Sequence, residues 1–194
     1  SGLCARTMDL TDDERAVLFD TPLLTMKPVI YVANVAEDEA AEEPVNNAAY
    51  MKVKEFAAAE NSAVIAVCAG IESEIAELDA EEKALFLEDL GIAESGLDRL
   101  IKASYALLGL ISYLTAGPQE VRAWTSTKGT KAPGAAGKIH SDLARGFIRA
   151  EIVSFDDLVK HGSMAAVKEA GLYRSEGKEY VMKDGDIVLF RFNV

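Results

Sequence analysis

Cysteine, histidine and long apolar runs are all scarce in this chain of 194 residues. No apolar run reaches the roughly 18 residues of a membrane span, and residues 1–10 lack the apolar core of a secretory leader. The two cysteines, Cys4 and Cys68, lie far apart, and the two histidines add no cluster of ligands. Neither a disulfide framework nor a metal site is therefore predicted, and we expect a reduced, cytoplasmic protein with no membrane partner.

Positive charge is also in short supply, because the formal net charge is −12. Residues 1–110 carry 8 Lys and Arg against 22 Asp and Glu, a net charge of −14, whereas residues 111–194 carry 12 against 10, a net charge of +2. An acidic surface repels nucleic acid. Any contact with RNA is therefore expected from a local patch in the C-terminal part, and the acidic helices are read as solvated faces.

A phosphate-binding loop is missing as well. Such a loop needs a glycine, four further residues, and then Gly-Lys-Ser/Thr. In residues 134–139 only two residues separate the glycines and isoleucine follows the lysine, and in residues 171–179 five residues separate them and glutamate follows. Phosphoryl transfer depends on positioning phosphates and neutralising their charge. We therefore assign no catalytic residue, expect no nucleotide hydrolysis from this chain alone, and predict that these glycines serve turns and helix contacts.

Two apolar runs rich in β-branched residues, 29–33 and 63–68, are present and are joined by a helical pattern over residues 46–59. Continuous apolar runs predict strands that are buried on both faces. A strand–helix–strand unit of this kind predicts a parallel sheet with a right-handed crossover. Tyr50, Val53 and Phe56 share one face of the predicted helix, which we expect to be its buried face.

The first strand runs into Asn34-Val35-Ala36-Glu37, and an Asn and an acid at this spacing can bind the edge of a nucleotide base. In P-loop GTPases Asn-Lys-x-Asp follows such a strand, and the Asp carboxylate accepts hydrogen bonds from guanine N1–H and N2–H₂. Here Val35 stands at the Lys position and Glu37 at the Asp position. The longer side chain of Glu37 misplaces a carboxylate tuned to guanine, which weakens a preference for guanine and leaves room for adenine.

The end of the second strand carries Cys68-Ala69-Gly70, where GTPases place a Ser-Ala pair whose backbone N–H groups contact the base. Because the carboxyl ends of parallel strands form the ligand-binding edge of such sheets, the two strand ends predict one base-binding rim. That rim comprises Asn34, Val35, Glu37, Cys68 and Ala69. The alternative is an ordinary loop, since loops after strands often carry Asn and Glu.

The remaining pattern up to residue 110 is mostly helical. Residues 11–14, Thr-Asp-Asp-Glu, form a capping box for a helix that reaches about Phe19, and residues 38–44 read as an acidic loop. Asp79 is expected to cap a helix over 80–90 that stops at Gly91. A further helix is predicted over 97–108, and its apolar residues are expected to face the core: Leu97, Leu100, Ile101, Leu107 and Leu108.

After Gly109 the pattern changes to short alternating strands, 111–114 and 121–127, around the turn Ala116-Gly117-Pro118. A helix follows over 135–143, then a strand over 148–153 and short helices near 155–159 and 164–170. Strands over 180–182 and 187–192 are predicted to form a hairpin across Asp184-Gly185. The order ββαβ…ββ predicts a small β-grasp domain.

Two groups of polar residues in this part could form a functional site, but their sequence patterns indicate it only weakly. His140 lies beside Ser141 and Asp142, but neighbours on a helix do not face one another, so no catalytic triad is predicted. Basic residues near Trp124 are a possible phosphate-contacting patch, with simple solubilisation as the alternative. These cations are Lys128, Lys131, Lys138, Arg145 and Arg149, with Arg174 farther along.

Taken together, these segments resemble the YchF proteins, or Obg-like ATPases, within the Obg group of P-loop NTPases. The resemblance covers nearly the whole chain and rests on residues 27–37, 88–91, 95–100, 113–117, 120–125, 139–142, 145–151 and 184–194. It implies an α/β part, formed by a portion of a P-loop NTPase domain with a parallel sheet and helices, followed by a small α+β, ubiquitin-like β-grasp (TGS) domain. The implied boundaries are 1–27 for the end of a helical insert, 28–110 for the C-terminal portion of the nucleotide-binding domain, and 111–194 for the TGS domain.

The same resemblance implies a function for the longer protein. That protein is expected to bind ATP or GTP with Mg²⁺ and to associate with ribosomes or RNA through the TGS domain. The chain begins at Ser1 rather than Met, and the P-loop and Mg²⁺ ligands of the family lie upstream of the matching segments. We therefore expect a fragment whose partner is the missing N-terminal half. The alternative is a non-enzymatic module that docks protein partners through the TGS domain.

Overall fold

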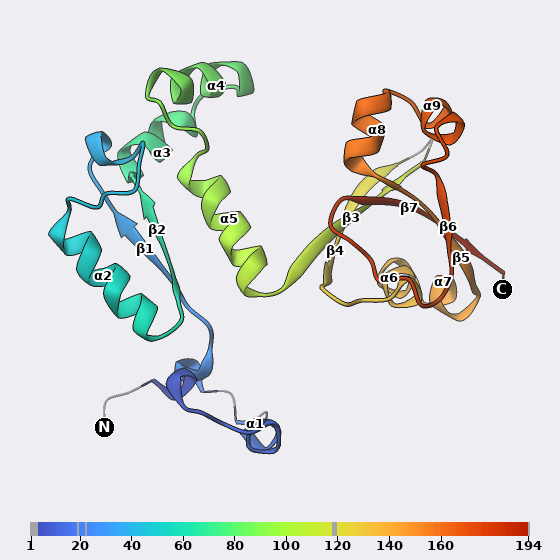
Figure 1. Ribbon diagram of the computed structural model, residues 1–194, viewed down its shortest axis with the longest axis horizontal. Coiled ribbons are helices and arrows are strands. Elements are labelled where there is room, and N and C mark those ends of the chain that lie inside the picture. The colour runs from blue at the N-terminus through green and yellow to red at the C-terminus, as the bar shows by residue number, and fades with distance from the viewer. Residues whose placement is uncertain (1–3, 19, 22, 118–119, 194) are drawn as a thin grey trace. The chain divides into compact units, whose positions relative to one another are not determined.

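The computed structural model describes residues 4–18, 20–21, 23–117 and 120–193. The chain divides into two compact units, the first ending at Leu107 and the second beginning at Leu108 (Figure 1). Phe19, the predicted helix end, Pro118 of the predicted turn, and Val194 lie outside the described residues. No helix among the described residues is long and apolar enough to cross a membrane.

The first unit is built on the predicted strand–helix–strand arrangement. β1 (Ile30–Asn34) and β2 (Ala63–Val67) pair in parallel, with Ile30 opposite Ala63 and Asn34 opposite Val67. α2 (Ala48–Ala59) connects them and begins at Asn47, whose Oδ1 accepts hydrogen bonds from the N–H groups of Ala49 and Tyr50, both at 3.0 Å. This cap satisfies two of the free N–H groups at the helix start.

Short helices complete the first unit. They are the 3₁₀ turns η1 (Ala5–Thr7), η2 (Leu24–Met26) and η3 (Glu37–Glu39), and the α-helices α1 (Asp12–Leu18), α3 (Ala69–Ile75), α4 (Ala80–Asp89) and α5 (Gly96–Leu107). The capping box before α1 is confirmed, because Glu14 Oε2 accepts from Thr11 N at 2.9 Å and Glu14 N donates to Thr11 Oγ1 at 3.3 Å. Asp79 caps α4 as expected. Residues 38–44 are predicted to form a loop, but Asp38 and Glu39 belong to the 3₁₀ turn η3.

An ion pair ties the N-terminal segment to the strand–helix–strand unit. Arg6 Nη2 lies 2.7 Å from Glu60 Oε2, and the Tyr31 hydroxyl donates to the same oxygen at 2.9 Å. The hydrogen bond from Arg6 is the largest of the effects that hold the pKa of Glu60 below its ordinary value. Residues before β1 are therefore fastened to the first strand and to the end of α2.

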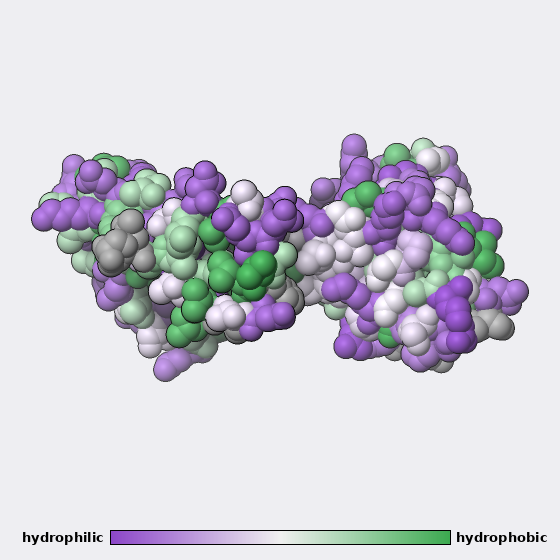
Figure 2. Space-filling view, turned by 90° about the horizontal axis from the view of Figure 1, so that it is seen from below, coloured by the Kyte–Doolittle hydropathy of each residue, from purple (hydrophilic) through white to green (hydrophobic). Residues whose placement is uncertain are grey.

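The prediction that the apolar faces of α5 and α2 are buried is largely wrong. Leu97 is 56% exposed, Ile101 48% and Leu108 57%, and Phe56 of α2 is 57% exposed although Tyr50 is buried. The apolar stripe was identified correctly, but two strands offer too little surface to cover it. Figure 2 shows apolar side chains gathered on one face of the first unit, in the left half of the view.

The second unit is a five-stranded mixed sheet with two pairs of short helices. Its elements are β3 (Leu110–Ala116), β4 (Val121–Thr127), α6 (Ala132–Ile139), α7 (Ser141–Arg145), β5 (Phe147–Ser154), α8 (Phe155–His161), α9 (Met164–Glu169), β6 (Arg174–Glu176) and β7 (Asp186–Phe192). The strand order is β4-β3-β7-β5-β6. β3 and β7 pair in parallel, and the other neighbours pair antiparallel.

Alternation along β5 sends its neighbouring residues to opposite faces of the sheet. Ile152 packs in the cluster that contains Ala132, Ala135 and Ala136 of α6. Val153 packs instead with Val167 of α9 and its surroundings. The helices α6–α7 and α8–α9 therefore cover opposite faces, as the ribbon shows (Figure 1). Beneath α6 the Tyr113 hydroxyl donates to the carbonyl of Ala135 at 2.8 Å, and burial raises the pKa of this tyrosine to about 12.

Two predicted elements of the second unit are corrected. The helix expected over 135–143 is broken at His140, whose extended backbone (φ −159°, ψ 143°) ends α6 and begins α7. The hairpin is also wrong, because residues 180–182 form no strand and Val181 makes only an isolated bridge to Lys131. The Asp-Gly turn does form, with Gly185 at φ +76°. It leads into β7, which pairs with β3 and β5 instead, and the short strand β6 was missed.

Candidate functional site

The predicted base-binding residues come together where β1 and β2 end. Asn34 lies opposite Val67, and the N–H of Val35 donates to the carbonyl of Val67 at 3.0 Å, which extends the ladder by one residue. The side-chain oxygen Oδ1 of Asn34 then accepts a hydrogen bond from the N–H of Ala69 at 3.0 Å. This bond clasps the two strand ends. It uses the oxygen of the amide, so the NH₂ group is the part of Asn34 that can donate to a ligand.

Glu37 and the first turn of α3 form the rest of the rim. Oε1 of Glu37 lies 3.6 Å from the position that a Cβ on Gly70 would occupy, and the Cys68 Sγ lies 3.7 Å from it. The carboxylate of Glu37 therefore lies near the start of α3. Glu37 and Ala69 are exposed, whereas Val35 and Cys68 are buried. The exposed pair can meet a ligand directly, and the buried pair forms the floor.

Packing behind the rim fixes the loop that carries Glu37. Cys68 belongs to an apolar cluster with Ala40, Ile71 and Ile75, and Val35 packs with Tyr50. The Asn47 side chain donates to Glu39 Oε2 at 3.0 Å, which ties the loop to the start of α2. The site is therefore held on regular elements rather than on a free loop.

Glu72 of α3 anchors the helix behind the site, and the sequence pattern did not indicate this role. Its carboxylate accepts hydrogen bonds from the N–H groups of Gly96 at 2.6 Å and Leu97 at 3.2 Å, so it acts as the anion at the N-terminus of α5. A Cβ on Gly96 would lie 2.8 Å from a methyl of Val67 and 2.9 Å from Glu72 Oε1. Only a glycine fits this close approach of α5 to β2. The two partners lie 24 residues apart, so no local spacing could reveal the contact.

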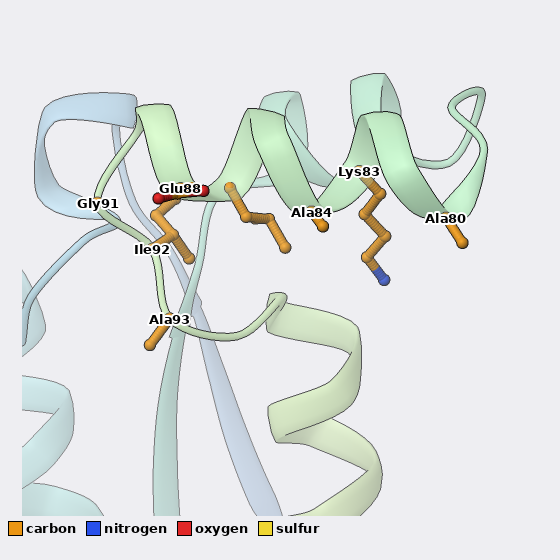
Figure 3. A pocket seen from close by; sticks show the side chains of 8 residues that line it. Ala80, Lys83, Ala84, Glu88, Gly91, Ile92 and Ala93 are labelled. Carbon is orange, nitrogen blue, oxygen red and sulfur yellow. The ribbon is translucent and has the colours of Figure 1, made fainter.

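A pocket in the same unit does not include the rim. It has a volume of about 590 Å³ and lies under α4, with Lys83, Glu88 and Ile92 among its lining residues (Figure 3). Figure 3 shows the Lys83 side chain reaching from α4 into the hollow. Its Nζ lies 3.4 Å from Asp98 Oδ2, so the positive charge of Lys83 is already paired with a carboxylate. Without several polar groups directed at one point, this pocket is a weaker candidate than the rim.

The glycines that resemble a phosphate loop lie in other structures. Gly134 and Gly137 are both inside α6, and a Cβ on Gly137 would lie 3.2 Å from that of Ala144 in α7. Gly171 has φ +71° and follows the end of α9. These positions agree with the expected roles in turns and helix contacts. Among the described residues, no group of three or more His, Cys, Asp or Glu side chains could hold a metal ion.

His140 lies in a different local structure from the predicted one. It lies at the break between α6 and α7 rather than within a helix, and its Nδ1 accepts from the N–H of Asp142 at 3.2 Å. The imidazole therefore caps α7. Asp142 in turn binds Arg145 at 2.8 Å.

The predicted basic patch is divided, because Arg149 lies on the opposite sheet face from α6 and α7. Lys131 begins α6, Lys138 lies in its last turn, and Arg145 ends α7. Lys128 lies in the turn after β4. Arg149 is on β5 and points to the opposite face from α6, because Ala150 packs in the α6 cluster. Lys131 pairs with Glu179 and Arg145 with Asp142, whereas no ion pair is found for Lys128 or Lys138 within the described part of the chain.

Glu151 binds two arginines on the sheet face that carries α8 and α9. Arg191 donates to its Oε2 from Nε at 3.0 Å, Arg149 donates to Oε1 from Nη2 at 2.8 Å, and the Tyr173 hydroxyl donates at 3.1 Å. Arg191 contributes most and Arg149 next to lowering the pKa of Glu151 from 4.5 to about 2. The sequence could not predict this cluster, because Arg191 lies 40 residues from Glu151.

Replacing Glu151 by glutamine should destabilise the second unit at pH 7 by about 1–2 kcal/mol, because charge-assisted hydrogen bonds are lost. The folded pKa, about 2, lies below the ordinary 4.5, so the stabilisation is present above about pH 4.5 and is lost as the pH falls toward 2. Urea unfolding followed by the fluorescence of Trp124 measures it. As the pH falls from about 4.5 toward 2, the stability of the Glu151→Gln variant should decrease less than that of the unchanged chain. Glu169→Gln, at an exposed position, is the control, and equal pH profiles for all three proteins would contradict the assignment.

Comparisons with known proteins agree on one family. The family model "YchF-GTPase_C: Protein of unknown function (DUF933)" matches residues 110–193. The Ribosome-binding ATPase YchF of Bacillus subtilis is 61% identical over 190 residues, which are 98% of this chain and 52% of that protein. Obg-like ATPase 1 of Rattus norvegicus is 44% identical over 187 residues, which are 95% of this chain and 46% of that protein.

A solved structure shows the same arrangement of elements. The Schizosaccharomyces pombe YchF GTPase superposes with a TM-score of 0.82 and 34% sequence identity, covering 97% of this chain and 50% of that one. The chain thus spans about half the length of the relatives that it matches. The relatives are called ATPases and the solved protein a GTPase, so their names agree on a purine nucleotide and differ on the base.

Proposed function

The chain belongs to the YchF family of Obg-like ATPases and corresponds to the C-terminal half of its members, and from this premise we propose that it carries two parts of their function. The first unit supplies the rim that binds the purine base. The second unit is a TGS domain with a β-grasp fold that associates with the ribosome or its RNA. On this proposal the whole protein acts in the cytoplasm, where ribosomes are found.

The observation that carries the proposal is the hydrogen bond from Ala69 N–H to Asn34 Oδ1 at 3.0 Å. It joins the carboxyl ends of two parallel strands, the place where sheets of this class bind nucleotides. It also orients the Asn34 amide so that its NH₂ group can meet an acceptor on the base edge. Glu37 is exposed beside it and follows the strand at the spacing of a base-reading acid.

Hydrolysis is not proposed for this chain alone. The rim residues fit a purine base, but the phosphate-binding loop and Mg²⁺ site of a P-loop enzyme have no counterpart in this sequence. When bound, Mg²⁺ would neutralise phosphate charge, and its ligands would come from the other half of the longer protein. The exposed apolar face of α5 supports that half as a partner, because Leu97 and Ile101 need a cover.

The second unit is the better candidate for ribosome contact. Its sequence carries a net charge of +2 over residues 111–194, whereas residues 1–110 carry −14. In the strand order β4-β3-β7-β5-β6, the strands β3 and β7, which come first and last along the chain in this unit, pair in parallel inside the sheet. This arrangement suits a β-grasp. The curated bacterial relatives are named for ribosome binding. Lys128 and Lys138, for which we find no ion pair among the described residues, are the first cations to test.

Co-sedimentation with ribosomes tests the proposal. We expect the whole chain to pellet with ribosomes at low salt and to be released steeply as the salt rises, because phosphate contacts release counterions. Lys138→Ala should reduce the salt slope by about 1, and Lys160→Ala on α8 is the matched control. Calorimetry with ATP should give no micromolar affinity for the chain alone, and such an affinity would contradict the proposal.

A protein-docking module remains the second candidate, and the exposed apolar side chains of the chain favour it. Apolar docking changes little with salt, whereas RNA binding weakens. Association with ribosomes that is insensitive to salt would therefore favour the second candidate.

A further inference from the structure

The second unit contains a pocket of about 490 Å³ that none of the proposed contacts uses. It lies between Ala116, Gly117 and Glu120 at the adjoining ends of β3 and β4, the break between α6 and α7, and the end of β7. Apolar side chains make most of its wall, including Trp124, Ile139, Leu143, Phe190 and Phe192. The volume is in the range of sites that take small molecules or single groups of a larger ligand.

Trp124 is held in place at this pocket. Its Nε1–H donates to Thr115 Oγ1 at 3.0 Å, and the guanidinium of Arg122 lies 4.2 Å from the centre of its ring. Since the polar atom of the indole already has a partner, the ring offers apolar π surface alone. Phe192 also lines the pocket and is 46% exposed. Two aromatic side chains therefore line the same pocket.

The charges on the elements around the opening are mixed, with cations in the majority. Arg122 precedes Trp124 by two residues on β4, Lys138 precedes Ile139 on α6, and Arg145 follows Leu143 on α7. Glu120 lines the opening near Arg122, and Asp142 binds Arg145. Of these five groups Glu120 lines the pocket itself, whereas Arg122 lies over the Trp124 ring and Lys138 and Arg145 are exposed on the helices whose Ile139 and Leu143 line it.

We propose that this pocket takes an unstacked base of single-stranded RNA, an inference that rests on the proposed association of the second unit with RNA. Recognition of single strands combines bases placed on aromatic rings and guanidinium planes with cations that meet the backbone. An apolar peptide side chain would use the same wall but would gain nothing from Arg122, Lys138 and Arg145. A base in the pocket uses both features.

Trp124 is the single tryptophan of the chain, so its fluorescence reports on the pocket directly. A single-stranded RNA decamer titrated into the whole chain should quench Trp124 saturably. A duplex of the same sequence should not, because its bases are stacked inside the helix. Inorganic polyphosphate of similar charge should not either. Phe192→Ala should weaken decamer binding about tenfold, toward the lower part of the range for one lost stacking contact.

Two further variants separate stacking from folding. Phe192→Leu keeps an apolar side chain at the end of β7 and should also weaken binding. Phe155→Ala removes a comparably exposed phenylalanine, 49% exposed on α8 and outside the pocket, and should bind like the unchanged chain. Circular dichroism confirms that each variant is folded.

Four outcomes are possible, and each of them either supports or overturns the inference. Quenching by the decamer that weakens in both Phe192 variants supports the inference. Decamer binding without quenching and without sensitivity to Phe192 overturns it but leaves RNA association intact, as ribosome co-sedimentation would show. Quenching by an apolar peptide and not by RNA assigns the pocket to proteins and overturns it. Loss of both decamer binding and co-sedimentation overturns the inference and the proposed function together.

Discussion

Gly146→Ala is expected to destabilise the second unit by about 2–3 kcal/mol. A Cβ at this position would lie 2.2 Å from the carbonyl oxygen of Asn193 and 2.8 Å from its carbonyl carbon. These are backbone atoms, so no rotation of a side chain relieves the overlap, and overpacking of this kind costs about 1–3 kcal/mol. The N–H of Asn193 also donates to the carbonyl of Gly146 at 2.9 Å, and that bond would be lost with the displacement.

The displacement would reach farther than the chain end. Phe192 pairs with Phe147 in the register of β7 and β5, and Phe190 packs at a tilt against Phe147 with ring centres 6.1 Å apart. Moving Asn193 therefore disturbs the last pairing of a central strand. The backbone of Gly146 itself is not strained, at φ −92°, so the cost comes from the close approach and not from conformation.

Urea unfolding followed by Trp124 fluorescence measures this effect, because the single tryptophan lies in the second unit. Gly177→Ala is the matched control, since nothing lies within 4 Å of its Cβ position and its φ is not positive. That substitution should be neutral or slightly stabilising, because it lowers the entropy of the unfolded chain. Equal midpoints for the two variants would show that the approach of Asn193 to Gly146 is not needed for stability.

The parts of the fold that depend on local pattern were predicted well. The parallel pairing of β1 with β2 was expected from two apolar runs and a connecting helix, and it is observed. The caps at Thr11 and Asp79 were also read correctly, because a cap needs only residues within one turn. Such features need no knowledge of distant partners.

Errors arose where a partner lies far along the chain. The Asp184-Gly185 turn forms, but a turn signal does not say which strands it joins, and β7 pairs with strands whose residues lie more than 30 positions away. The apolar stripe on α5 was recognised, yet periodicity shows which face is apolar and not whether anything covers it. Leu97 and Ile101 remain exposed for that reason.

The candidate site shows the same division. Strand ends in a parallel sheet must meet, so the closeness of Asn34 and Ala69 followed from the predicted topology. The position of the Glu37 carboxylate near Gly70 did not, because it depends on how the turn η3 packs beside α3. Trp124 and Phe192 both line the pocket in the second unit, but they lie 68 positions apart in the sequence. No spacing rule could have indicated that pocket.

Asn34→Ala should lower purine-nucleotide affinity by up to about tenfold in a protein that joins this chain to the upstream half of its relatives. The substitution removes the hydrogen bond from the Asn34 NH₂ group to the base, worth about 0.5–1.5 kcal/mol, and it also removes the bond from Ala69 N–H, whose loss lowers stability. The longer protein is needed because the phosphate groups of the nucleotide require a site that this chain lacks. Calorimetry with ATP and GTP measures the change.

Asn34→Asp separates the two roles of this residue. A carboxylate still accepts from Ala69 N–H, so the clasp between the strand ends is kept, but it has no NH₂ group to donate to the base. If Asn34 contacts the base, the Asp variant should lose affinity while keeping the unfolding midpoint of the unchanged protein, and the Ala variant should lose both. Asn46→Ala, at an exposed position before α2, is the control. An Asp variant that binds ATP as tightly as the unchanged protein would mean that Asn34 only clasps the strands, and the base would then have to be read by Glu37 and the start of α3.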